Sequence, residues 1–247
     1  MGNDPASSIQ SSQNQASQSR LSQSRLSQLQ AGSIKAVIFD MDGLLLDSER
    51  IAFVAFKFAC ARFNLGDQSK VFMQCVGTNQ LAGERILYQE FRAIANVSEF
   101  LKVWDDRYLA ETSRQPIPLK PGVTALLKRL AELAIPVAVA TSTKTLRAKA
   151  KLEFSGILSH FSVVVGGDQV EQSKPAPEIY WHTAQMLGLN AASCMVLEDS
   201  ENGVRAGVAA GMLVIQIPDL IAPSAELRSL GAPVLKSLED VLDQYFS

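Results

Sequence analysis

The stretch AVIFDMDGLLLDSE, residues 36–49, places two carboxylates two positions apart at the end of an apolar run. Three apolar residues lead directly into Asp40, and Asp42 follows after one methionine. A carboxylate can attack phosphorus as a nucleophile and form an aspartyl-phosphate. A second acid nearby can protonate the leaving oxygen and later deprotonate the attacking water. Because residues i and i+2 of an extended segment point to the same side, we expect Asp40 and Asp42 to face one reacting atom.

Further polar residues stand at the ends of other apolar runs. Thr141 ends the run VAVAT, and Glu198 and Asp199 end the run MVLED. Lys174 lies in the loop QSKPAPE. Taken singly, an aspartate after a strand is commonly a turn residue, and a loop lysine is usually solvated. Together, the acids would form an all-oxygen, anionic pocket of the kind that suits Mg²⁺. Lys174 and the Thr141 hydroxyl would supply the positive charge and the donor that a phosphoryl group needs.

From residue 121 onward the sequence alternates short apolar runs with helical patterns. The apolar runs predict strands at 135–141, 161–166, 194–199 and 212–218. Helical patterns cover 123–134, 144–153, 177–188 and 202–211. Uninterrupted Val, Ile and Leu strands that alternate with helices predict a parallel sheet covered on both faces. Ligands of such sheets bind beyond the carboxyl ends of the strands, which is where the polar residues fall.

The last of these helical patterns contains three glycines among alanines, which suit a helix packed close to the sheet: Gly203, Gly207 and Gly211.

Residues 50–118 interrupt the alternation, because they contain helical patterns and no convincing strand. The segment IAFVAFKFACARF aligns four side chains on one helix face: Phe53, Phe56, Cys60 and Phe63. We interpret that stripe as helix-packing core rather than as a ligand site. We therefore predict a helical subdomain at 50–118, inserted into an α/β domain made of residues 34–49 and 119–247.

Composition limits the classes of partner. A formal net charge of −2 gives no basic footprint for nucleic acid. The apolar runs are too short and interrupted for a transmembrane helix. Three widely spaced cysteines without a CxxC pair fit buried thiols in a reducing compartment, and two histidines exclude a three-histidine metal site within one chain. We expect a cytoplasmic monomer that binds neither nucleic acid nor membranes.

The first 33 residues consist largely of Ser and Gln and repeat the unit SQSRL. They offer too little apolar surface to offset the entropy of ordering, so we predict that residues 1–33 are disordered. A transit peptide is one alternative, because the tail contains Arg20 and Arg25 and a single acid, Asp4. Another is that the tail binds a partner protein and that this binding is the main role of the chain. A secretory signal is excluded by the lack of a continuous apolar core.

Four sequence blocks closely resemble, in order, the four motifs of the haloacid dehalogenase (HAD) superfamily: DMDGLLLDSE, VAVATS, SKPAPEIY and VLEDSENGVRAG. The resemblance covers nearly all of residues 34–247. It implies an α/β fold with a Rossmann-like, doubly wound parallel sheet, the HAD core. It also implies that the helical insertion at 50–118 is a C1-type cap, which closes over the site and excludes water.

The resemblance also implies roles for the acids. Asp40 would be the nucleophile and Asp42 the general acid and base. Mg²⁺ would be held by Asp40, the backbone carbonyl of Asp42 and Asp199, with Glu198 supporting it through water. These acids make Mg²⁺ the expected cofactor.

The remaining motif residues would bind the phosphoryl group, namely Thr141 and Lys174, with Ser142 nearby. Haloacid dehalogenases resemble this chain but lack an acid at the position of Asp42, so its presence points to phosphoryl transfer. We therefore expect a Mg²⁺-dependent phosphatase that hydrolyses a small phosphorylated metabolite, either a sugar or polyol phosphate or phosphoglycolate.

Two other functions are alternatives to this one. A sugar-phosphate mutase similar to β-phosphoglucomutase would carry a cap histidine and a cap arginine where this chain has Ala52 and Gln80. Both departures disfavour the mutase. A non-catalytic phosphoryl sensor of the receiver type would be shorter, would lack the inserted cap and would not place DxD at its first strand.

Overall fold

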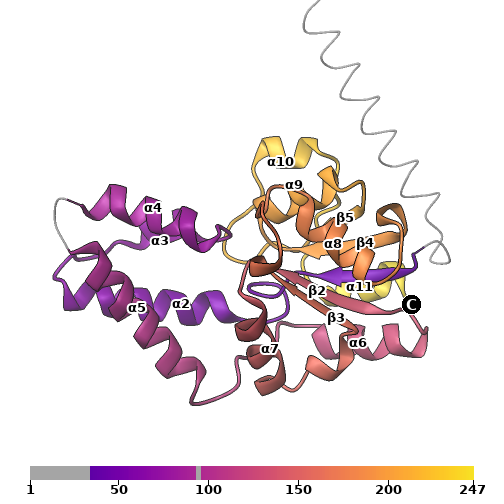
Figure 1. Ribbon diagram of the computed structural model, residues 1–247, viewed down its shortest axis with the longest axis horizontal. Coiled ribbons are helices and arrows are strands. Elements are labelled where there is room, and N and C mark those ends of the chain that lie inside the picture. Colours follow the sequence, from indigo (N-terminus) through magenta and orange to yellow (C-terminus); the bar gives the residue numbers. More distant parts are fainter. Residues whose placement is uncertain (1–33, 93–95) are drawn as a thin grey trace, which may run out of the picture.

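The computed structural model describes residues 34–92 and 96–247. This part of the chain contains one parallel sheet, with strands β1 (Ala36–Phe39), β2 (Val137–Thr141), β3 (Val163–Gly166), β4 (Cys194–Glu198) and β5 (Leu213–Gln216). The strand order is β3-β2-β1-β4-β5 (Figure 1). Because the order reverses at β1, the sheet is doubly wound, and the predicted fold class is confirmed. The predicted disordered tail, residues 1–33, lies outside the described residues.

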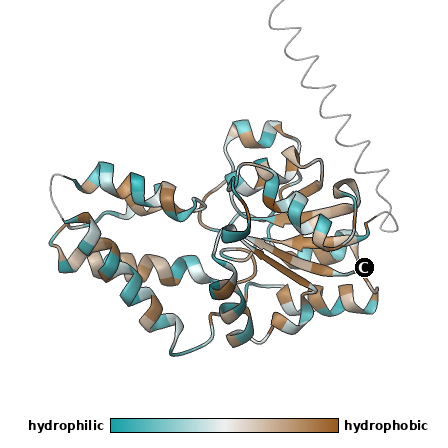
Figure 2. Ribbon diagram, in the orientation of Figure 1, coloured by the Kyte–Doolittle hydropathy of each residue, from teal (hydrophilic) through white to brown (hydrophobic). Residues whose placement is uncertain are grey.

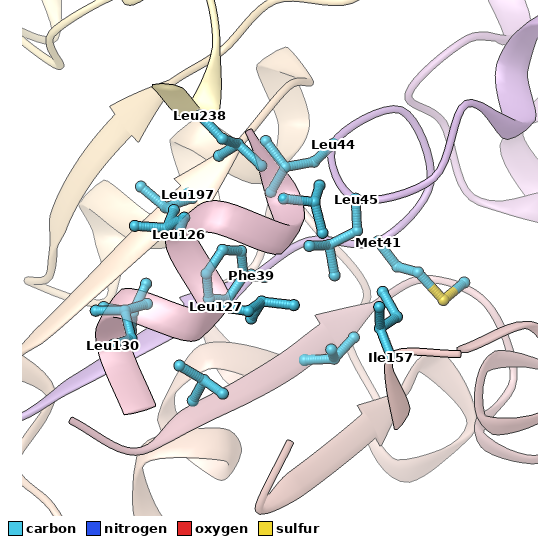
Figure 3. Close-up of a cluster of buried hydrophobic side chains, with 14 of the residues drawn as sticks. Phe39, Met41, Leu44, Leu45, Leu126, Leu127, Leu130, Ile157, Leu197 and Leu238 are labelled. Atoms are coloured by element: carbon cyan, nitrogen blue, oxygen red, sulfur yellow. The ribbon is translucent and has the colours of Figure 1, made fainter. Parts of the chain in front are cut away.

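Helices cover both faces of this sheet. One face packs against α6 (Val123–Glu132), α7 (Thr145–Phe154) and α11 (Leu238–Tyr245), and the other against α8 (Glu178–Met186), α9 (Glu201–Ala209) and α10 (Ala225–Ser229). Val37 and Phe39 belong to the first face, and Ala36 and Ile38 to the second. Figure 3 shows Phe39 among leucines of α6. Burial on both faces explains why β1 is an uninterrupted apolar run.

Between β1 and α6 the chain forms α2 (Ser48–Arg62), α3 (Ser69–Cys75), α4 (Gln80–Phe91) and α5 (Val97–Thr112), which lie beside the sheet in Figure 1. We call α2–α5 the helical unit. Figure 2 shows mixed hydrophilic and hydrophobic residues along its helices. Its own hydrophobic cluster contains Phe56 and Cys60, with Phe53 and Phe63 packed against it. The predicted stripe is therefore core.

The ends of the helical unit do not by themselves define domains, so the boundaries at 49/50 and 118/119 stay predictions. Among the described residues, no helix combines the length and apolar character needed to cross a bilayer. The monomeric state and the cytoplasmic location also stay predictions.

The three glycines around α9 have two different roles. A Cβ added at Gly203 would overlap Oε1 of Glu198, and one at Gly207 would lie 2.7 Å from Cγ2 of Val214. Both glycines therefore allow α9 to approach the sheet closely. Gly211 has a φ of +76°, and an added Cβ would meet no other heavy atom within 4 Å. It ends the helix in the left-handed conformation, so the prediction that it serves close packing is wrong.

Candidate active site

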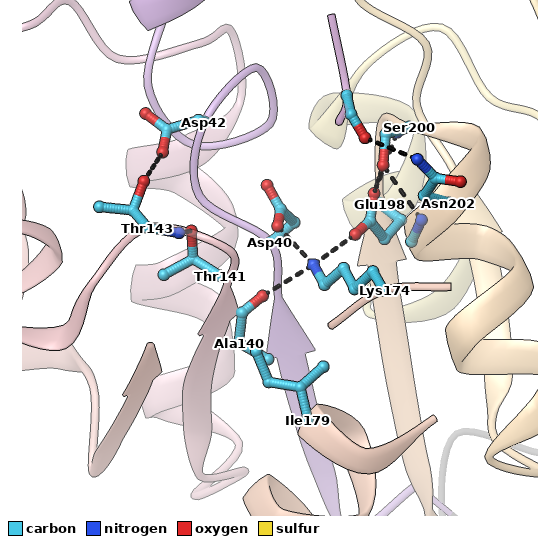
Figure 4. Close-up of polar contacts among 12 residues, drawn as sticks. Asp40, Asp42, Ala140, Thr141, Thr143, Lys174, Ile179, Glu198, Ser200 and Asn202 are labelled. Atoms are coloured by element: carbon cyan, nitrogen blue, oxygen red, sulfur yellow. Dashed lines mark hydrogen bonds and ion pairs between the residues drawn. The ribbon is translucent and has the colours of Figure 1, made fainter. Parts of the chain in front are cut away.

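Lys174 lies at the centre of the carboxyl edge of the sheet, between two carboxylates. Its Nζ donates to Oδ1 of Asp40 at 2.6 Å, to Oε1 of Glu198 at 2.6 Å and to the carbonyl oxygen of Ala140 at 3.0 Å (Figure 4). All three charged residues are buried. Burial alone would lower the pKa of Lys174, but the carboxylates of Asp40 and Glu198 outweigh it and hold that pKa well above its ordinary value. Lys174 therefore stays charged beside Asp40.

Glu198 is engaged on both of its carboxylate oxygens. Oε1 also accepts from the hydroxyl of Tyr180 at 2.9 Å, and Oε2 accepts from the N–H and the Oγ of Ser200, each at 3.0 Å. Ser200 in turn caps α9, since its Oγ accepts from the N–H of Gly203 at 3.1 Å. Glu198 thus joins Lys174 to the start of α9, and its contacts favour a supporting role over direct binding of a ligand.

Asp42 lies beyond β1, in the loop that leads to α2, so strand alternation does not set its direction. Its Oδ1 accepts from Oγ of Ser48 and from Nζ of Lys151, and its Oδ2 accepts from Oγ1 of Thr143, all at 2.7 Å. Burial would raise the pKa of Asp42, but the Lys151 ammonium and the hydrogen bonds from Lys151, Thr143 and Ser48 hold it below its ordinary value. These contacts therefore favour the ionised form of the Asp42 carboxylate in this arrangement.

The remaining acids at this edge carry more negative charge than the nearby cations balance. Burial raises the pKa of Asp40 to about 7, against the effect of Lys174, and the carboxylates of Glu198 and Asp42 raise it further. Burial, then Glu198, Asp40 and Glu49, raises the pKa of Asp199 well above its ordinary value. Burial also raises the pKa of Glu49 to about 7, with Asp42 contributing next. A cation bound near Asp40 and Asp199 would relieve this repulsion.

The donor set fits Mg²⁺ in particular. Within residues 34–92 and 96–247, no group of three or more His, Cys, Asp or Glu side chains is arranged to hold a metal alone. Mg²⁺ commonly binds one or two carboxylates and completes its shell with waters and substrate phosphate. The Asp199 carboxylate lies directly against the turn at Gly43, where φ is +89° and an added Cβ would overlap it. Only glycine therefore lets this acid approach the loop that carries Asp42.

The predicted phosphate-binding residues are placed differently from one another. Thr141 is buried at the end of β2, and its Oγ1 accepts from the N–H of Thr143 at 3.1 Å. Lys174 contacts Asp40 directly. Ser142 is exposed, and no side-chain hydrogen bond among the described residues joins it to the other candidates. The structure thus joins Asp40, Lys174 and Glu198 by direct contacts and leaves Ser142 apart. Asp199 lies close enough to Glu198 and Asp40 for their carboxylates to raise its pKa.

Sequence patterns missed several residues around the two catalytic candidates: Ser48, Glu49, Thr143, Lys151 and Tyr180. Ser48 and Glu49 directly follow the DMDGLLLD block, and Thr143 lies two positions after Thr141, so proximity to a motif could have indicated them. Lys151 has no such signal, because it is one of several basic residues on α7.

Comparisons with known proteins now add to this geometry. Residues 37–217 match the family described as haloacid dehalogenase-like hydrolase. The chain belongs to this family. The HAD resemblance and the predicted combination of parallel sheet and helical cap are thereby confirmed.

Several relatives of this HAD-like hydrolase are named as phosphatases. (DL)-glycerol-3-phosphatase 2 of Arabidopsis thaliana is 33% identical over 200 residues, which are 76% of this chain and 81% of that relative. The bifunctional riboflavin kinase/FMN phosphatase of the same plant is 28% identical over 83% of this chain, which matches about half, 54%, of its length. The crystal structure of CbbY from Rhodobacter sphaeroides in complex with phosphate has a TM-score of 0.67 and 27% identity, and the match covers 84% of this chain and 96% of that one.

Proposed function

We propose that this HAD-family phosphatase hydrolyses a small sugar or polyol monophosphate through an aspartyl-phosphate on Asp40, with Mg²⁺ as its cofactor. The observation that carries the proposal is a pair of carboxylates at one sheet edge with different surroundings. Asp40 is buried against Lys174, whereas Asp42 is partly exposed and surrounded by donors. The first surroundings suit a nucleophile, and the second suit a group that exchanges protons with substrate and water.

The proposed reaction has two steps. Asp42 first takes up a proton from solvent. In the first step, a carboxylate oxygen of Asp40 bonds to phosphorus, the bond from phosphorus to the leaving oxygen breaks, and Asp42 gives that oxygen its proton. Lys174 balances the charge on the phosphoryl oxygens, and the Thr141 hydroxyl donates to one of them. In the second step, Asp42 takes a proton from water as the water attacks phosphorus. Inorganic phosphate leaves, and the Asp40 carboxylate is restored.

The residues that would hold Mg²⁺ are Asp40, Asp199 and the backbone carbonyl of Asp42, with Glu198 behind them through water. The raised pKa values of Asp40 and Asp199 support this placement, because burial and then the neighbouring carboxylates disfavour their charged forms, which a bound cation would favour. When bound, Mg²⁺ would neutralise charge on the phosphoryl oxygens and reduce their repulsion from the carboxylates.

A cavity of about 280 Å³ lies between the helical unit and the sheet edge, and Asp199 is the one candidate site residue among the described residues that line it. We take residues 50–118 as the cap above it. The α3–α4 segment contributes Met73, Val76 and Gly77, and the sheet side contributes Asp199, Asn202 and Leu220, among others. None of the described residues that line it is Lys, Arg or His. A second phosphate, or the carboxylate of phosphoglycolate, would meet acids there, so an uncharged sugar or polyol leaving group fits best.

A sugar-phosphate mutase remains the alternative, and two contacts disfavour it. The side chain of Gln80 is exposed and donates to Glu84 of its own helix at 2.8 Å. Ala52 offers only its backbone carbonyl, which accepts from Nε1 of Trp104 at 3.0 Å. Neither position provides a charge that could grip the second phosphate of a bisphosphate intermediate.

The test is release of inorganic phosphate from a panel of monophosphates by the purified chain. The panel contains glycerol 3-phosphate, hexose phosphates, phosphoglycolate and nucleotides, each with Mg²⁺. We expect the highest kcat/KM for a sugar or polyol phosphate, loss of activity with EDTA and recovery when Mg²⁺ is restored. Phosphate release from none of them in Mg²⁺ would contradict the proposal.

The same assay separates hydrolysis from isomerisation. The chain is incubated with β-glucose 1-phosphate, Mg²⁺ and a trace of glucose 1,6-bisphosphate, and both products are followed. Glucose 6-phosphate that forms faster than inorganic phosphate would favour the mutase.

A further inference from the structure

One face of α7 carries two basic residues, Arg147 and Lys151, that meet the cap helix α5. Nη2 of Arg147 donates to Oδ1 of Asp105 at 3.0 Å. The Arg147 guanidinium lies 5.4 Å from the centroid of the Tyr108 ring, and Nζ of Lys151 lies 5.2 Å from the same centroid. Tyr108 is buried although it belongs to a helix of the cap. This contact is therefore a specific junction between α5 and α7.

Lys151 is not an ordinary solvated charge at the end of a helix. Its side chain is only 11% exposed, and its ammonium is enclosed between the Tyr108 ring and the Asp42 carboxylate. Lys149, two positions earlier on α7, is exposed. Enclosing an ammonium in this way is costly unless it is paired, and both the aromatic face and the carboxylate compensate that cost.

The three donors to Asp42 fix the direction of its carboxylate. Ser48 and Lys151 share Oδ1, and Thr143 occupies Oδ2. Hydroxyl groups can rotate and can either donate or accept, so Ser48 and Thr143 tolerate several carboxylate orientations. The ammonium can only donate, and its long side chain is held in place by Tyr108. Lys151 is thus the partner that selects one orientation of Asp42.

We propose that Lys151 is a positioning residue for Asp42: held by Tyr108 of the cap, it orients the Asp42 carboxyl group for proton transfer to the leaving oxygen. The inference rests on the proposed phosphatase function. Asp42 remains the catalytic residue and gives its proton to the leaving oxygen as the bond to phosphorus breaks. Lys151 transfers no proton and acts through Asp42 alone.

The test compares esters that differ in their need for an acid. The leaving alcohol of glycerol 3-phosphate requires a proton, whereas the phenolate of 2,4-dinitrophenyl phosphate does not. Because kcat/KM reports the steps up to cleavage of the leaving bond, Lys151→Met should lower it about 10- to 100-fold for glycerol 3-phosphate. For the dinitrophenyl ester the loss should stay under about 3-fold. If another alkyl phosphate of the panel is cleaved faster, it replaces glycerol 3-phosphate.

Three further variants make the result specific. Lys149→Met, the matched control on the same helix, should leave both esters unchanged. Lys151→Arg should recover part of the loss, because it restores a charged donor. In the Asp42→Asn background, Lys151→Met should cause no additional loss for the alkyl ester, since residues that act through one group are not additive. If Lys151→Met does not melt like the wild type, Lys151→Gln takes its place in the comparison.

If Lys151→Met lowers kcat/KM equally for both esters, or lowers it for neither, the proposed role of Lys151 is overturned. An additive loss in the Asp42→Asn background would overturn it as well. Failure of the proposed function has a different signature: the wild type would cleave neither ester, or Asp40→Asn would retain wild-type activity.

Discussion

Asp40 and Asp42 are only two residues apart, yet their carboxylates are held by different parts of the molecule. Asp40 contacts Lys174, and Lys174 is fixed by Glu198 and by the carbonyl of Ala140, so its surroundings belong to the sheet edge. The donors to Asp42 come from the start of α2, the loop after β2 and α7. The Asp40 side chain is 11% exposed, and that of Asp42 is 23% exposed.

This difference suggests how one site can combine a rigid group with an adjustable one. Lys174, the partner of Asp40, lies in the loop before α8, but the carbonyl of Ala140 in β2 and the carboxylate of Glu198 in β4 fix its ammonium to the sheet. Two of the three partners of Asp42 are tied to the helical unit: Ser48 belongs to α2, and Lys151 lies against the Tyr108 ring of α5. The orientation of Asp42 therefore depends on how these helices pack. Changes on the Asp40 side should therefore affect both stability and all substrates, whereas changes on the Asp42 side should depend on the leaving group.

The largest expected effect is that of Asp40→Asn. An amide is a poor nucleophile and a weaker ligand for Mg²⁺, so turnover should fall by about 10³-fold or more for alkyl and aryl esters alike. The measurement is phosphate release together with the melting temperature, which should show that the fold is kept. Asp243→Asn, at an exposed position on α11, is the matched control. Wild-type-like turnover by Asp40→Asn would show that Asp40 is not the nucleophile.

The next effect is that of Asp42→Asn, which removes the acid and base but keeps the size of the side chain. For glycerol 3-phosphate, kcat/KM should fall by about 10²- to 10⁴-fold, the usual contribution of a general acid. For 2,4-dinitrophenyl phosphate the fall should be much smaller. A similar fall in kcat/KM for the two esters would mean that Asp42 is not the general acid that its surroundings indicate.

Gly203→Ala tests whether the contacts around Asp40 are rigid, because it disturbs Glu198, which holds Lys174 beside Asp40. The added methyl group would overlap the Glu198 carboxylate, which holds Lys174. Forcing such an overlap typically costs about 1–3 kcal/mol, so the urea midpoint should fall and activity on both esters should fall with it. Val208→Ala, at a more exposed position on the same helix, should change stability by less than about 0.5 kcal/mol. An unchanged urea midpoint for Gly203→Ala would show that the residues around Glu198 can move to accommodate the added methyl group.

The smallest effect concerns the start of α7, which carries the partner of Asp42. Oδ1 of Asp168 accepts from the N–H of Thr145 at 2.6 Å and from its Oγ1 at 2.8 Å, and these bonds hold the pKa of Asp168 below its ordinary value of 3.8. A carboxyl group with a lowered pKa in the folded state adds stability above its ordinary pKa, and that stability is lost as the pH falls through both values. Asp168→Ala should therefore lower the melting temperature slightly at pH 7, and the difference from wild type should shrink below about pH 4. A difference that is constant with pH would contradict this account.

The sequence alone determined the sheet and the members of its edge. Runs of Val and Ile buried on both faces can only be central parallel strands, and the carboxyl ends of such strands must meet at one edge. That is why Asp40, Lys174 and Glu198, which are separated by up to 158 positions, could be grouped before any contact was known, and they are in contact. The same argument grouped Thr141 and Asp199 with them, and the catalytic roles that the HAD motifs imply for these two residues stay predictions.

Tertiary structure decided what surrounds Asp42. Lys149 and Lys151 are the same residue type on one helix, and nothing in the local sequence separates them. Only the packing of α5 against α7 buries one beneath Tyr108 and leaves the other in water. Likewise, Asp42 lies past the end of β1, where loop geometry and not strand alternation directs the side chain. The presence of strands follows from local hydrophobic pattern, whereas the direction of a side chain in a loop or on a helix depends on contacts with segments distant in the chain.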